Sequence, residues 1–488
     1  MTDSQIYNLI PVFDEMRVDF ETPVSIFMKV KAHMLLESVE KGENVGRFSI
    51  IAVGKRTVIQ LQGRNYSKTE YQFPTDSSFT DPQTTAGDAE NPLVFIREYF
   101  KEFTVPPYLN LPPFFGGAVG YLGYETHRYF ENIPIPKNGD SNGNIVPDGL
   151  LVIPEVLLVY DSVKRTVFVI VLTRPGNDPD TVYRYAEERI AEICRMLAAP
   201  VPTYSKDLSF NGQPVTLSPR TDKPGFLGAV KTCKDHIVAG DIIQAVISQK
   251  FDIQTDSPPF ELYRSLRILN PSPYMFYLDF DDFYLIGSSP EVMVRVQDNE
   301  VLLKPIAGTR KRGQTVTEDT AAAEELLADP KERAEHLMLV DLGRNDLGRV
   351  AVPGSVRVTD FMKIEKFSHV MHIVSTIKAE LAEQYDSFDV IRACFPAGTL
   401  TGAPKIRAME IIAAIETEPR GPYGGMIFNM GFNGNMDSCI TIRTIILRDR
   451  KACVQVGAGI VADSLPENEY EETMNKAQAL IKAIELAR

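Results

Sequence analysis

Two segments of the sequence carry pairs of glutamates at a spacing that suits metal binding. Glu332 and Glu335 lie three residues apart in "DPKERAEHLMLVDL" (329–342), and Glu469 and Glu472 repeat this spacing in "PENEYEET". Residues three apart share one face of a helix, so each pair projects together. Two such helices can hold a hard cation such as Mg²⁺, which takes one or two carboxylates and keeps water or substrate oxygens. Solvated helix faces that complement the helix dipole are the alternative that spacing alone leaves open.

Helix signals surround both pairs of glutamates. Asp329 precedes a proline and predicts the start of the first helix, whose glutamates lie opposite Ala334, Leu337 and Met338. In the last helix Ser464 and Glu467 predict a capping box, and Lys476 joins the acidic face. The stripe expected to be buried there comprises Tyr470, Met474, Ala477, Ile481 and Ile484.

Two basic side chain types occur in otherwise apolar runs. Arg443 lies inside the β-branched run "CITIRTIIL", where a buried cation needs an anionic partner, either a protein carboxylate or a bound ligand. His369 and His372 lie three apart in "FSHVMHIVSTI", and a strand would send them to opposite faces, which argues against a shared metal. A single histidine there is either a catalytic group or a hydrogen-bonded core residue.

A glycine-rich stretch near the C-terminus suggests a cofactor site that its surroundings contradict. "VQVGAGIVAD" places Gly457-x-Gly459-x-x-Ala462 after a strand, as in a dinucleotide fingerprint of an oxidoreductase. Ser464 and Pro466 delay the next helix, so its N-terminus cannot lie beneath a pyrophosphate. The glycines can still bring backbone N–H groups to a carboxylate.

Two further loops could bind an anion. "LLKPIAGTRKRG" (302–313) sets a Gly-Thr pair before the cations Arg310, Lys311 and Arg312, but it carries the small apolar Ala307 in front of them. "GTLTGAPK" (398–405) has the wrong glycine spacing for a phosphate loop and lacks its Lys-Ser/Thr end.

Composition limits the class of protein. The 488 residues are 44% hydrophobic, which is ample for two or three domains, and the net charge of -14 argues against a nucleic-acid or anionic-membrane surface. The five cysteines are too scattered for a disulfide framework or a CxxC metal site. The start of the chain lacks a signal-peptide pattern and no run is apolar enough to span a membrane, so we expect a cytoplasmic protein.

Turn-rich stretches divide the chain. Polar loops are expected at 74–92 and 131–147, followed by a β-hairpin at 156–173 and an amphipathic helix at about 181–198. The proline-rich stretch 199–225 is the best linker. Strands and helices then alternate irregularly, so α+β is the expected class. We therefore predict an N-terminal domain (1–200), a linker (201–225) and a catalytic domain (226–488).

Several long motifs resemble those of the chorismate-utilising enzymes over roughly residues 225–488. They are "PIAGTRKRG", "ERAEHLMLVDLGRNDLGRV", "VMHIVS", "FPAGTLTGAPKIRAMEII" and the combination of "ITIRT", "VGAGIVADS" and "EYEET". "HMLLES" and "NPSPYMFYL" are similar to the large subunits of anthranilate synthases. The resemblance implies a two-domain α/β sandwich with antiparallel sheets, a central active-site cleft, and the first committed step of tryptophan biosynthesis.

The same resemblance implies roles for individual residues. Glu335 and Glu472 match the Mg²⁺ ligands, supported by Glu332 and Glu469, and Glu291 and His372 match candidates for proton transfer. Positions that match the chorismate site are Gly308, Thr309, Tyr423, Arg443, Gly457, Ala458, Gly459 and Lys476. In relatives that make aminodeoxychorismate or isochorismate, lysine usually replaces the residue at Ala307. Alanine would leave room for ammonia to attack the substrate directly.

The resemblance also implies partners and a regulator. None of the cysteines stands in a Gly-x-Cys-x-Gly elbow, so we expect a separate glutamine amidotransferase subunit in a hetero-oligomer. Leu36, Glu37 and Ser38, with Pro273, Tyr274 and Met275, match a tryptophan feedback site. The family usually continues Gly-Gly-Ala-Val-Gly-Tyr after Tyr423, whereas this chain has "GGMIFN", which places Phe428 and Asn429 near that site.

Other chorismate enzymes share nearly all of these motifs. An enzyme that stops at 2-amino-2-deoxyisochorismate without expelling pyruvate is the nearest alternative, followed by aminodeoxychorismate and isochorismate synthases. A nicotinamide oxidoreductase rests on the Gly457 and Gly459 stretch alone. A non-catalytic amino-acid-binding regulator would explain Leu36 to Ser38 but neither the paired carboxylates nor Arg443.

Overall fold

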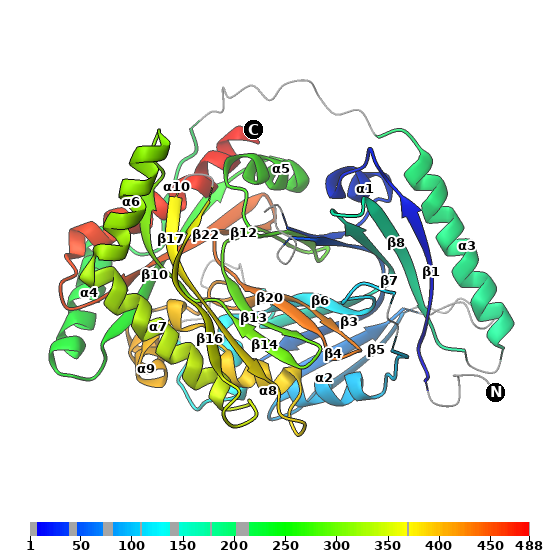
Figure 1. Ribbon diagram of the computed structural model, residues 1–488, viewed down its shortest axis with the longest axis horizontal. Coiled ribbons are helices and arrows are strands. Elements are labelled where there is room, and N and C mark those ends of the chain that lie inside the picture. The colour runs from blue at the N-terminus through cyan, green and yellow to red at the C-terminus, as the bar shows by residue number, and fades with distance from the viewer. Residues whose placement is uncertain are drawn as a thin grey trace.

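The computed structural model describes residues 7–38, 46–71, 82–107, 110–136, 146–175, 178–201, 214–367 and 370–487 (Figure 1). The N-terminal strands are β1 (Ile10–Arg17), β2 (Met34–Glu37), β3 (Phe48–Gln62), β4 (Asn65–Glu70), β5 (Gln83–Asp88), β6 (Gly117–Leu122), β7 (Gly149–Asp161) and β8 (Thr166–Thr173). The later strands are β9 (Ser218–Pro219), β10 (Gln244–Gln254), β11 (Tyr274–Asp279), β12 (Tyr284–Ser289), β13 (Val292–Gln297), β14 (Glu300–Leu303), β15 (Ile306–Lys311), β16 (Arg357–Lys366), β17 (Val370–Glu380), β18 (Gly402–Ala403), β19 (Met426–Gly431), β20 (Met436–Ile440), β21 (Thr444–Arg448) and β22 (Lys451–Ile460).

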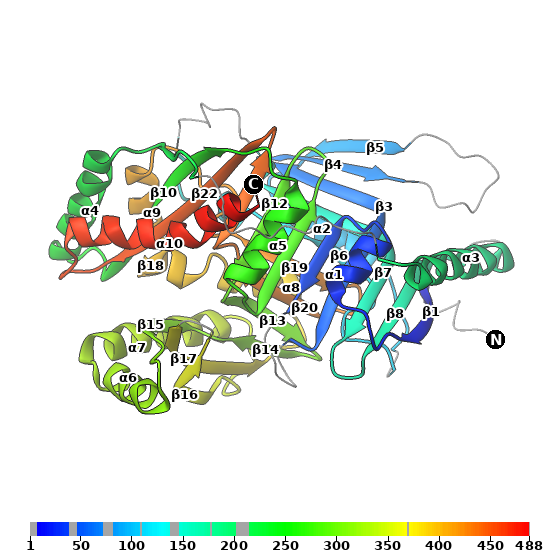
Figure 2. The same cartoon turned by 90° about the horizontal axis from the view of Figure 1, so that it is seen from above.

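Helices cover the strands on several sides. They are α1 (Pro23–Lys29), α2 (Pro92–Lys101), α3 (Pro179–Ala198), α4 (Lys223–Val238), α5 (Pro259–Leu269), α6 (Val316–Ala328), α7 (Pro330–Gly348), α8 (Ser387–Cys394), α9 (Lys405–Ile415) and α10 (Pro466–Leu486), with the 3₁₀ turns η2 (Tyr124–Tyr129) and η3 (Gly398–Leu400). In Figure 2, α6 and α7 lie over β15–β17, while α10 and α5 lie over β22 and β12. These two groups of elements supply the two sides of the site described below.

Two long strands, β3 and β7, join two antiparallel sheets. They pair along most of their lengths, with a register shift between Lys55 and Thr57. Before the shift β3 pairs with β2, and after it with β4; β7 pairs with β6 through its first residues and with β8 through its last. A bulge bends a strand and increases its twist, so each strand can pass from one sheet into the other. This arrangement confirms the predicted α+β class with antiparallel sheets.

Strands from the two predicted domains pair with each other. β2 pairs with β11, and β6 pairs with β19, so backbone hydrogen bonds cross the predicted boundary near residue 200. The hydrophobic core follows this layout, because successive residues of β2 face different clusters. Met34 packs in the large core between the sheets, and Leu35 packs in a second core beneath α1, α3, α5 and α10. The predicted division into domains stays a prediction.

Several sequence-based boundaries differ from the structure. The hairpin at 156–173 and the helix at 181–198 are confirmed as β7–β8 and α3. The loop predicted at 74–92 contains β5, which pairs with β4, although residues 72–81 lie outside the described part of the chain. Residues 137–145 of the loop at 131–147 also lie outside it.

The predicted linker and the predicted capping box both need correction. The linker 201–225 contains β9 and extends too far, because Asp222 accepts a hydrogen bond from Gly225 N–H and starts α4 at Lys223. Its residues 202–213 lie outside the described chain. The capping box is wrong because Pro466 occupies the first turn of α10, so Ser464 is too early and instead accepts from Val461 N–H at 3.0 Å.

Candidate active site

A cavity of about 850 Å³, here called the first cavity, collects most of the residues predicted for substrate, metal and proton transfer. Those that line it are Glu291, Gly308, Thr309, Glu332, Glu335, His372, Tyr423, Arg443, Gly457, Gly459, Glu469, Glu472 and Lys476. Ala458 is the exception. It alternates with two lining glycines on β22, so its methyl group points into the core against α4 and α9.

The N-terminus of α7 holds one pair of glutamates at the cavity. Asp329 Oδ1 accepts from Lys331 N–H at 2.9 Å and from Glu332 N–H at 3.3 Å, which confirms the predicted cap. The apolar residues opposite the glutamates are not the buried face of this helix. Leu337 is 46% exposed, whereas His336 and Leu339 are buried, because α7 packs on β15 and β17 through a different side.

The second pair of glutamates projects from α10. Its buried stripe matches the prediction at Ala477, Ile481 and Ile484, while Tyr470 and Met474 are partly buried. On the opposite face Lys476 Nζ forms an ion pair with Glu472 Oε1 at 2.7 Å. The same ammonium donates to Gly457 O at 2.9 Å, so it joins the helix to β22.

The glutamates of the two helices act on each other electrostatically. Burial raises the pKa of Glu335, and the charges of Glu332 and Glu472 raise it further, while Gln244 Nε2 donates to Glu335 Oε1 at 3.4 Å. Burial and the charge of Glu472 likewise raise the pKa of Glu469. Carboxylates that disfavour each other's ionisation are stabilised by a cation placed between them.

This donor set fits Mg²⁺. Within the described residues, no three His, Cys, Asp or Glu side chains already converge as a complete set of ligands. Mg²⁺ does not require such a set, because it is usually held by one or two carboxylates while water and substrate oxygens fill its other positions. Glu332, on the same helix, and Glu472, on α10, both act electrostatically on Glu335 in the cavity.

Arg443 lies at a break between β20 and β21 rather than inside a strand as the β-branched run predicts. Its φ of 51° is left-handed, and its carbonyl accepts from Ser288 N–H at 3.1 Å. Burial lowers the pKa of the guanidinium, and no carboxylate among the described residues pairs with it. Of the two partners that the sequence leaves open, the bound ligand is therefore favoured.

A side chain at three glycine positions of the cavity would crowd neighbouring protein atoms. A Cβ on Gly457 would lie 2.7 Å from Tyr423 Oη and 2.9 Å from Ile247 O, and a Cβ on Gly459 would lie 2.7 Å from Gln244 Nε2. Gly308 has a φ of +67°, and a Cβ there would lie 3.0 Å from Glu332 Oε2. Gly457 and Gly459 lie inside β22, paired with β10, which rules out the strand-turn-helix geometry of a dinucleotide fingerprint.

Glu291 and His372 both occupy sites that favour their neutral forms. Glu291 follows β12, is 9% exposed, and burial raises its pKa to about 8, although Thr399 and the Lys476 charge oppose this effect. Burial lowers the pKa of His372, whose Nδ1 lies 2.8 Å from Gly308 O and 3.1 Å from Thr309 Oγ1. A carbonyl oxygen only accepts, so Nδ1 carries the proton and Nε2 of the neutral ring is the basic atom. His369 lies outside the described residues.

Two of the three cations in the loop 302–313 are not available to bind an anion. Arg310 pairs with Glu325, Asp329 and Glu332, and Arg312 pairs with Asp319, so both guanidinium groups are neutralised by protein carboxylates. Lys311 lines the first cavity. The roles of Arg310 and Arg312 are structural, because α6 and α7 pack directly against this loop.

Ala307 does not directly line the space predicted beside the substrate. It is 9% exposed and pairs with Ile373, while its neighbours Ile306 and Gly308 line the first cavity. Alternation along β15 turns the methyl group away from the cavity, so the predicted vacancy is not a feature of the cavity wall.

Sequence reasoning missed three polar residues of this site. Gln244 contacts Glu335, Thr399 acts on Glu291, and Gln455 lines the cavity. Glutamines and threonines inside β-rich segments carry no spacing signal of their own. Their position became evident only from the pairing of β10 with β22 and the approach of η3.

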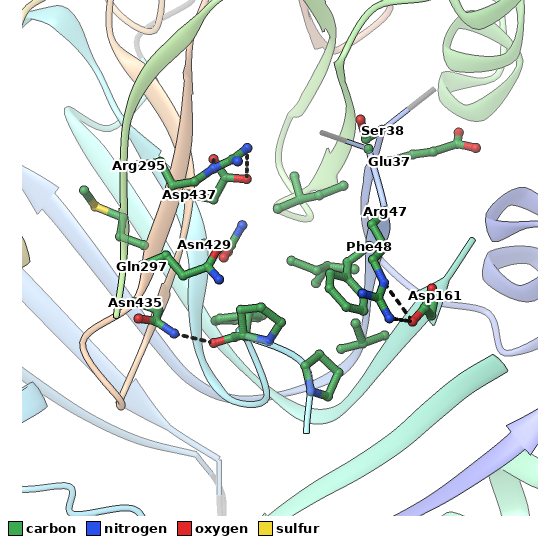
Figure 3. A pocket seen from close by; sticks show the side chains of 18 of the residues that line it. Glu37, Ser38, Arg47, Phe48, Asp161, Arg295, Gln297, Asn429, Asn435 and Asp437 are labelled. Carbon is green, nitrogen blue, oxygen red and sulfur yellow. Dashed lines mark hydrogen bonds and ion pairs between the residues drawn. The ribbon is translucent and has the colours of Figure 1, made fainter. Parts of the chain in front are cut away.

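A second cavity, of about 820 Å³, collects the six residues predicted for the inhibitor, namely Leu36, Glu37, Ser38, Pro273, Tyr274 and Met275 (Figure 3). Pairing of β2 with β11 brings the two predicted segments together. Ser38 Oγ is buried and has no partner among the described residues. Phe428 and Asn429 also line this cavity, as predicted from their place after Tyr423.

Glu37 is less suited to an inhibitor than its neighbours. Its two oxygens accept from Arg267 Nε and Nη2, each at 2.7 Å, and one of them also accepts from Tyr263 Oη at 2.8 Å. These groups belong to α5, on the opposite face of β2 from Leu36. The carboxylate therefore attaches the strand to the helix instead of pointing into the cavity.

Two global features bear on the predicted location and redox state. None of the described helices is long and apolar enough to cross a lipid bilayer. All five cysteines are free thiols, four of them buried, as expected from their scatter in the sequence.

Comparisons with known proteins agree with these motifs. Residues 32–482 match the family described as "chorismate binding enzyme". Anthranilate synthase component 1 of Aquifex aeolicus is 45% identical over 491 residues, covering 99% of this chain and 96% of the relative, and that of Acetivibrio thermocellus is 46% identical over 495 residues with the same coverage.

Solved structures share the fold. Anthranilate synthase component I from Streptococcus pneumoniae superposes with a TM-score of 0.77 at 36% identity, covering 95% of this chain and 98% of that one. The isochorismate synthase MenF from Escherichia coli superposes with a TM-score of 0.73 at 16% identity, covering 98% and 95%, which is a likeness of fold alone. With the paired glutamates, the unpaired Arg443 and the glycine-lined strand now placed around one cavity, the chain belongs to the chorismate-binding enzyme family.

Proposed function

We propose that this chain is the chorismate-binding subunit of an anthranilate synthase, a lyase of tryptophan biosynthesis that converts chorismate and ammonia to anthranilate, pyruvate and water. The observation that carries the proposal is the charge layout of the first cavity. Arg443, a buried cation that pairs with no carboxylate in the described part of the chain, and four glutamates from α7 and α10 line the same space. Chorismate carries two carboxylates, so one can pair with the arginine and the other with a metal held by the glutamates.

Arg443 and the glycine strand would bind the enolpyruvyl carboxylate. A guanidinium offers parallel N–H donors to a carboxylate, and Gly457 and Gly459 line the same cavity with their backbone. Tyr423 Oη lies against Gly457 and offers a hydroxyl donor there. Gly308 and Thr309 would contact the ring from the opposite wall.

Glu335 and Glu472 would hold Mg²⁺, flanked by Glu332 and Glu469. Bound Mg²⁺ supplies Lewis-acid polarisation of the ring carboxylate and offsets the substrate's negative charge inside an acidic protein. Lys476 already pairs with Glu472, so binding of the metal and substrate would redistribute this contact.

Glu291 is the proposed acid. Burial keeps its carboxyl protonated near neutral pH, so it can give a proton to the C4 hydroxyl, a poor leaving group otherwise. Water then leaves from C4 while the nitrogen of ammonia forms its bond to C2. Loss of the C2 proton and expulsion of pyruvate restore the aromatic ring. His372, neutral and unprotonated at Nε2, is the proposed base for that proton.

Ammonia would come from a separate glutamine amidotransferase subunit. The relatives are named component 1, which supports a second component, and this chain has no cysteine elbow for glutamine hydrolysis. Free ammonia at alkaline pH should replace the partner for the isolated chain.

The second cavity is the proposed site for tryptophan as a feedback inhibitor. The side chains of Leu36, Phe48 and Phe428 in its lining suit an indole ring, and Ser38 Oγ has no partner among the described residues and can bond to an amino acid. We expect inhibition to persist despite Phe428 and Asn429, because both leave the cavity large. A tryptophan titration that leaves the rate unchanged would contradict this.

The deciding experiment incubates the purified chain with chorismate, Mg²⁺ and ammonium at alkaline pH and follows anthranilate fluorescence and pyruvate. Equal amounts of both products support the proposal. An amine without pyruvate would identify a 2-amino-2-deoxyisochorismate synthase, and no amine would defeat the proposal. Turnover without a nicotinamide excludes the oxidoreductase.

A further inference from the structure

Gln455 on β22 is a buried residue of the first cavity with an unsatisfied amide oxygen. It lines the cavity on the same strand face as Gly457 and Gly459, and it is 5% exposed. Its Oε1 has no hydrogen-bond partner among the described residues. A buried acceptor without a donor is unfavourable, so this atom either destabilises the folded chain or accepts a hydrogen bond from a bound ligand.

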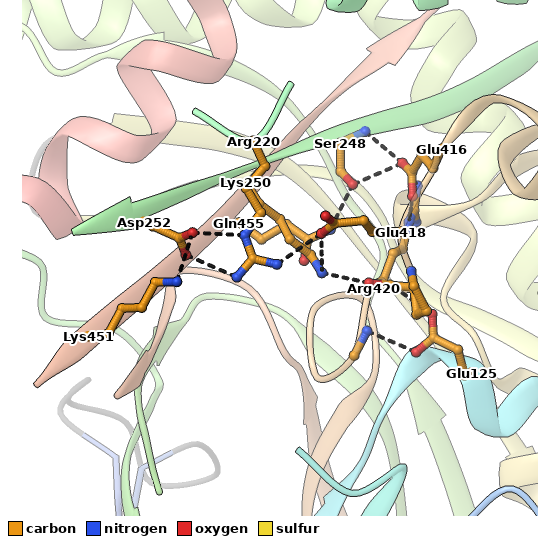
Figure 4. Close-up of polar contacts among 12 residues, drawn as sticks. Glu125, Arg220, Ser248, Lys250, Asp252, Glu416, Glu418, Arg420, Lys451 and Gln455 are labelled. Carbon is orange, nitrogen blue, oxygen red and sulfur yellow. Dashed lines mark hydrogen bonds and ion pairs between the residues drawn. The ribbon is translucent and has the colours of Figure 1, made fainter. Parts of the chain in front are cut away.

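A chain of hydrogen bonds determines which way the amide faces (Figure 4). Gln455 Nε2 donates to Ser248 Oγ at 2.8 Å, and Ser248 Oγ donates to Glu416 Oε1 at 2.9 Å. Because the serine proton is committed to a carboxylate, Ser248 Oγ can only accept from Gln455. An amide nitrogen can use that acceptor and an amide oxygen cannot, so the oxygen faces away from Ser248.

The carboxylate at the end of this chain is itself fixed. Arg420 donates to Glu416 Oε1 through Nη2 at 2.7 Å and to Oε2 through Nε at 2.8 Å, and its side chain is 1% exposed. The same guanidinium donates to Leu400 O and Val246 O, at 2.7 and 2.6 Å, which tie it to two walls of the first cavity. Ser248, Glu416 and Arg420 therefore act as positioning residues for the amide of Gln455.

Gln455 and the proposed acid, Glu291, line the same cavity. Lys476 Nζ donates to Gly457 O at 2.9 Å, and the same ammonium is close enough to Glu291 to act on its carboxyl. Gly457 is two residues from Gln455 on the same face of β22. Gly457 and Lys476 thus connect the strand face that carries Gln455 with the side of the cavity that carries Glu291.

The chemistry of chorismate offers one suitable partner for an acceptor at this place. Its carboxylates and ether oxygen only accept hydrogen bonds, and its C4 hydroxyl is the one donor of the dianion. A hydroxyl that donates to Gln455 keeps its lone pairs for the proton from Glu291. Protonation strengthens its O–H groups as donors, so the contact becomes stronger as water leaves.

We infer that Gln455 is a substrate-recognition residue whose amide oxygen accepts a hydrogen bond from the C4 hydroxyl of chorismate as that hydroxyl departs. The inference rests on the proposed function. In the step, Glu291 gives its proton to the C4 oxygen, the C4–O bond breaks with its electron pair on oxygen, and water leaves. The nitrogen of ammonia forms the new bond at C2 as the ring double bonds shift.

The test compares Gln455→Leu with Gln249→Leu. Gln249 is a matched control on β10, because it is 2% exposed, has an unpaired Oε1, donates through Nε2 to Thr473 Oγ1, and does not line the cavity. Initial rates with chorismate and ammonium are measured for both variants. Competitive inhibition is then measured with a chorismate analogue that carries hydrogen in place of the C4 hydroxyl.

We expect Gln455→Leu to lower kcat/KM for chorismate by about 10- to 100-fold, with the KM for ammonium unchanged. The inhibition constant of the deoxy analogue should stay within about twofold of wild type, because that ligand never uses the amide oxygen. Gln249→Leu should leave kcat/KM within about twofold of wild type even if its melting temperature falls. Equal weakening of chorismate and the analogue, or no loss for chorismate, would overturn the inference.

Ser248→Ala keeps the inference testable if Gln455→Leu does not fold. It retains the amide but removes the group that orients it, so a smaller loss, of about 3- to 10-fold for chorismate and none for the analogue, is expected. An unchanged kcat/KM would count against the positioning role. Wild-type release of anthranilate with pyruvate tests the proposed function separately, since it does not depend on any variant.

Discussion

The two large cavities have nearly equal volumes, about 850 and 820 Å³, but the arginines that line them differ in whether a carboxylate pairs with them. In the first, Arg443 has no carboxylate partner among the described residues, and burial, with the charges of Glu332 and Glu472, raises the pKa of Glu335. In the second, charged groups are paired: Arg47 Nη2 lies 2.7 Å from Asp161, and Arg295 Nε lies 3.1 Å from Asp437. The unpaired guanidinium and the buried Glu335 suit the proposed charged substrate and metal, whereas paired arginines line the cavity proposed for the inhibitor.

The two cavities nevertheless share chain segments. Asn270, Pro271 and Ser272 line the first cavity, and the next residues, Pro273 to Met275, line the second. The stretch from β20 to Arg443 likewise runs from one cavity to the other. A ligand that shifts either segment in the second cavity therefore acts on the backbone of the first.

The largest effect should come from removing a carboxylate of the first cavity. Glu335→Gln or Glu472→Gln should lower anthranilate formation at least about 1,000-fold, because the metal loses a charged ligand. Calorimetry should show weakened Mg²⁺ binding, and the melting temperature of Glu335→Gln should not fall, since repulsion by Glu332 and Glu472 is relieved. Glu467→Gln, exposed on the same helix and outside the cavity, is the control. Near-normal turnover of the first two variants would remove the metal assignment.

Neutralising an arginine should have opposite consequences in the two cavities. Arg443→Leu should lower kcat/KM for chorismate about 100-fold without loss of unfolding free energy, because it removes a buried charge that lacks a partner. Arg295→Leu should cost about 1–3 kcal/mol of unfolding free energy, because it leaves Asp437 and Tyr274 without their shared donor. Urea unfolding and steady-state rates check both. Equal losses of stability would contradict the distinction between paired and unpaired charge.

The pH dependence should report Glu291. Its folded-state pKa of about 8 lies above the ordinary 4.5, so the acid form is present below pH 8 and is lost as the pH rises through it. At a constant concentration of free ammonia, kcat/KM for chorismate should fall about tenfold per pH unit above that point. Glu291→Gln should be slow and lack this limb.

The same group should also make stability pH-dependent. Between pH 4.5 and 8 the unfolded chain releases this proton and the folded chain keeps it. The free energy of unfolding of the wild-type protein therefore falls as the pH rises through this range. Glu291→Gln should therefore gain stability relative to wild type at pH 8 compared with pH 4. An unchanged difference between the two would show that the carboxyl titrates normally.

The smallest effect should come from the second cavity. Ser38→Ala should raise the tryptophan concentration for half-inhibition by about tenfold, because an amino acid loses its hydrogen bond to Oγ. The rate without tryptophan should change less than about twofold, since Ser38 does not line the first cavity. Loss of the basal rate together with inhibition would show that the cavities are not separable.

Periodic and capping signals predicted the parts of the site that are local. The cap at Asp329 starts α7, and the spacing of Glu332 and Glu335 follows from helical geometry, so neighbours along the chain suffice to orient them. The acidic face of α10 follows in the same way, although Pro466 moved its start past the predicted capping box. The motif resemblance then assigned roles that spacing had left open.

Tertiary packing decided what local patterns could not. Arg443 lies in a β-branched run but leaves the strand in a left-handed conformation, which no propensity of that run predicts. Ala307 and Ala458 alternate with lining residues and so point away from the first cavity, and Arg310 is neutralised by carboxylates of α6 and α7. Each outcome depends on which surface packs against the residue.

Side-chain types and their short spacings identified the groups of the candidate site, namely two carboxylate pairs, a buried cation and a glycine-rich strand, and the motif resemblance assigned their roles. The folded chain was needed to show which charges remain unpaired and to place Ser38 with Tyr274 and Gln455 with Ser248. The physical reason is distance: helical and strand periodicity act over a few residues, whereas pairing, burial and orientation are determined by neighbours about 200 residues or more away, as between β10 and β22.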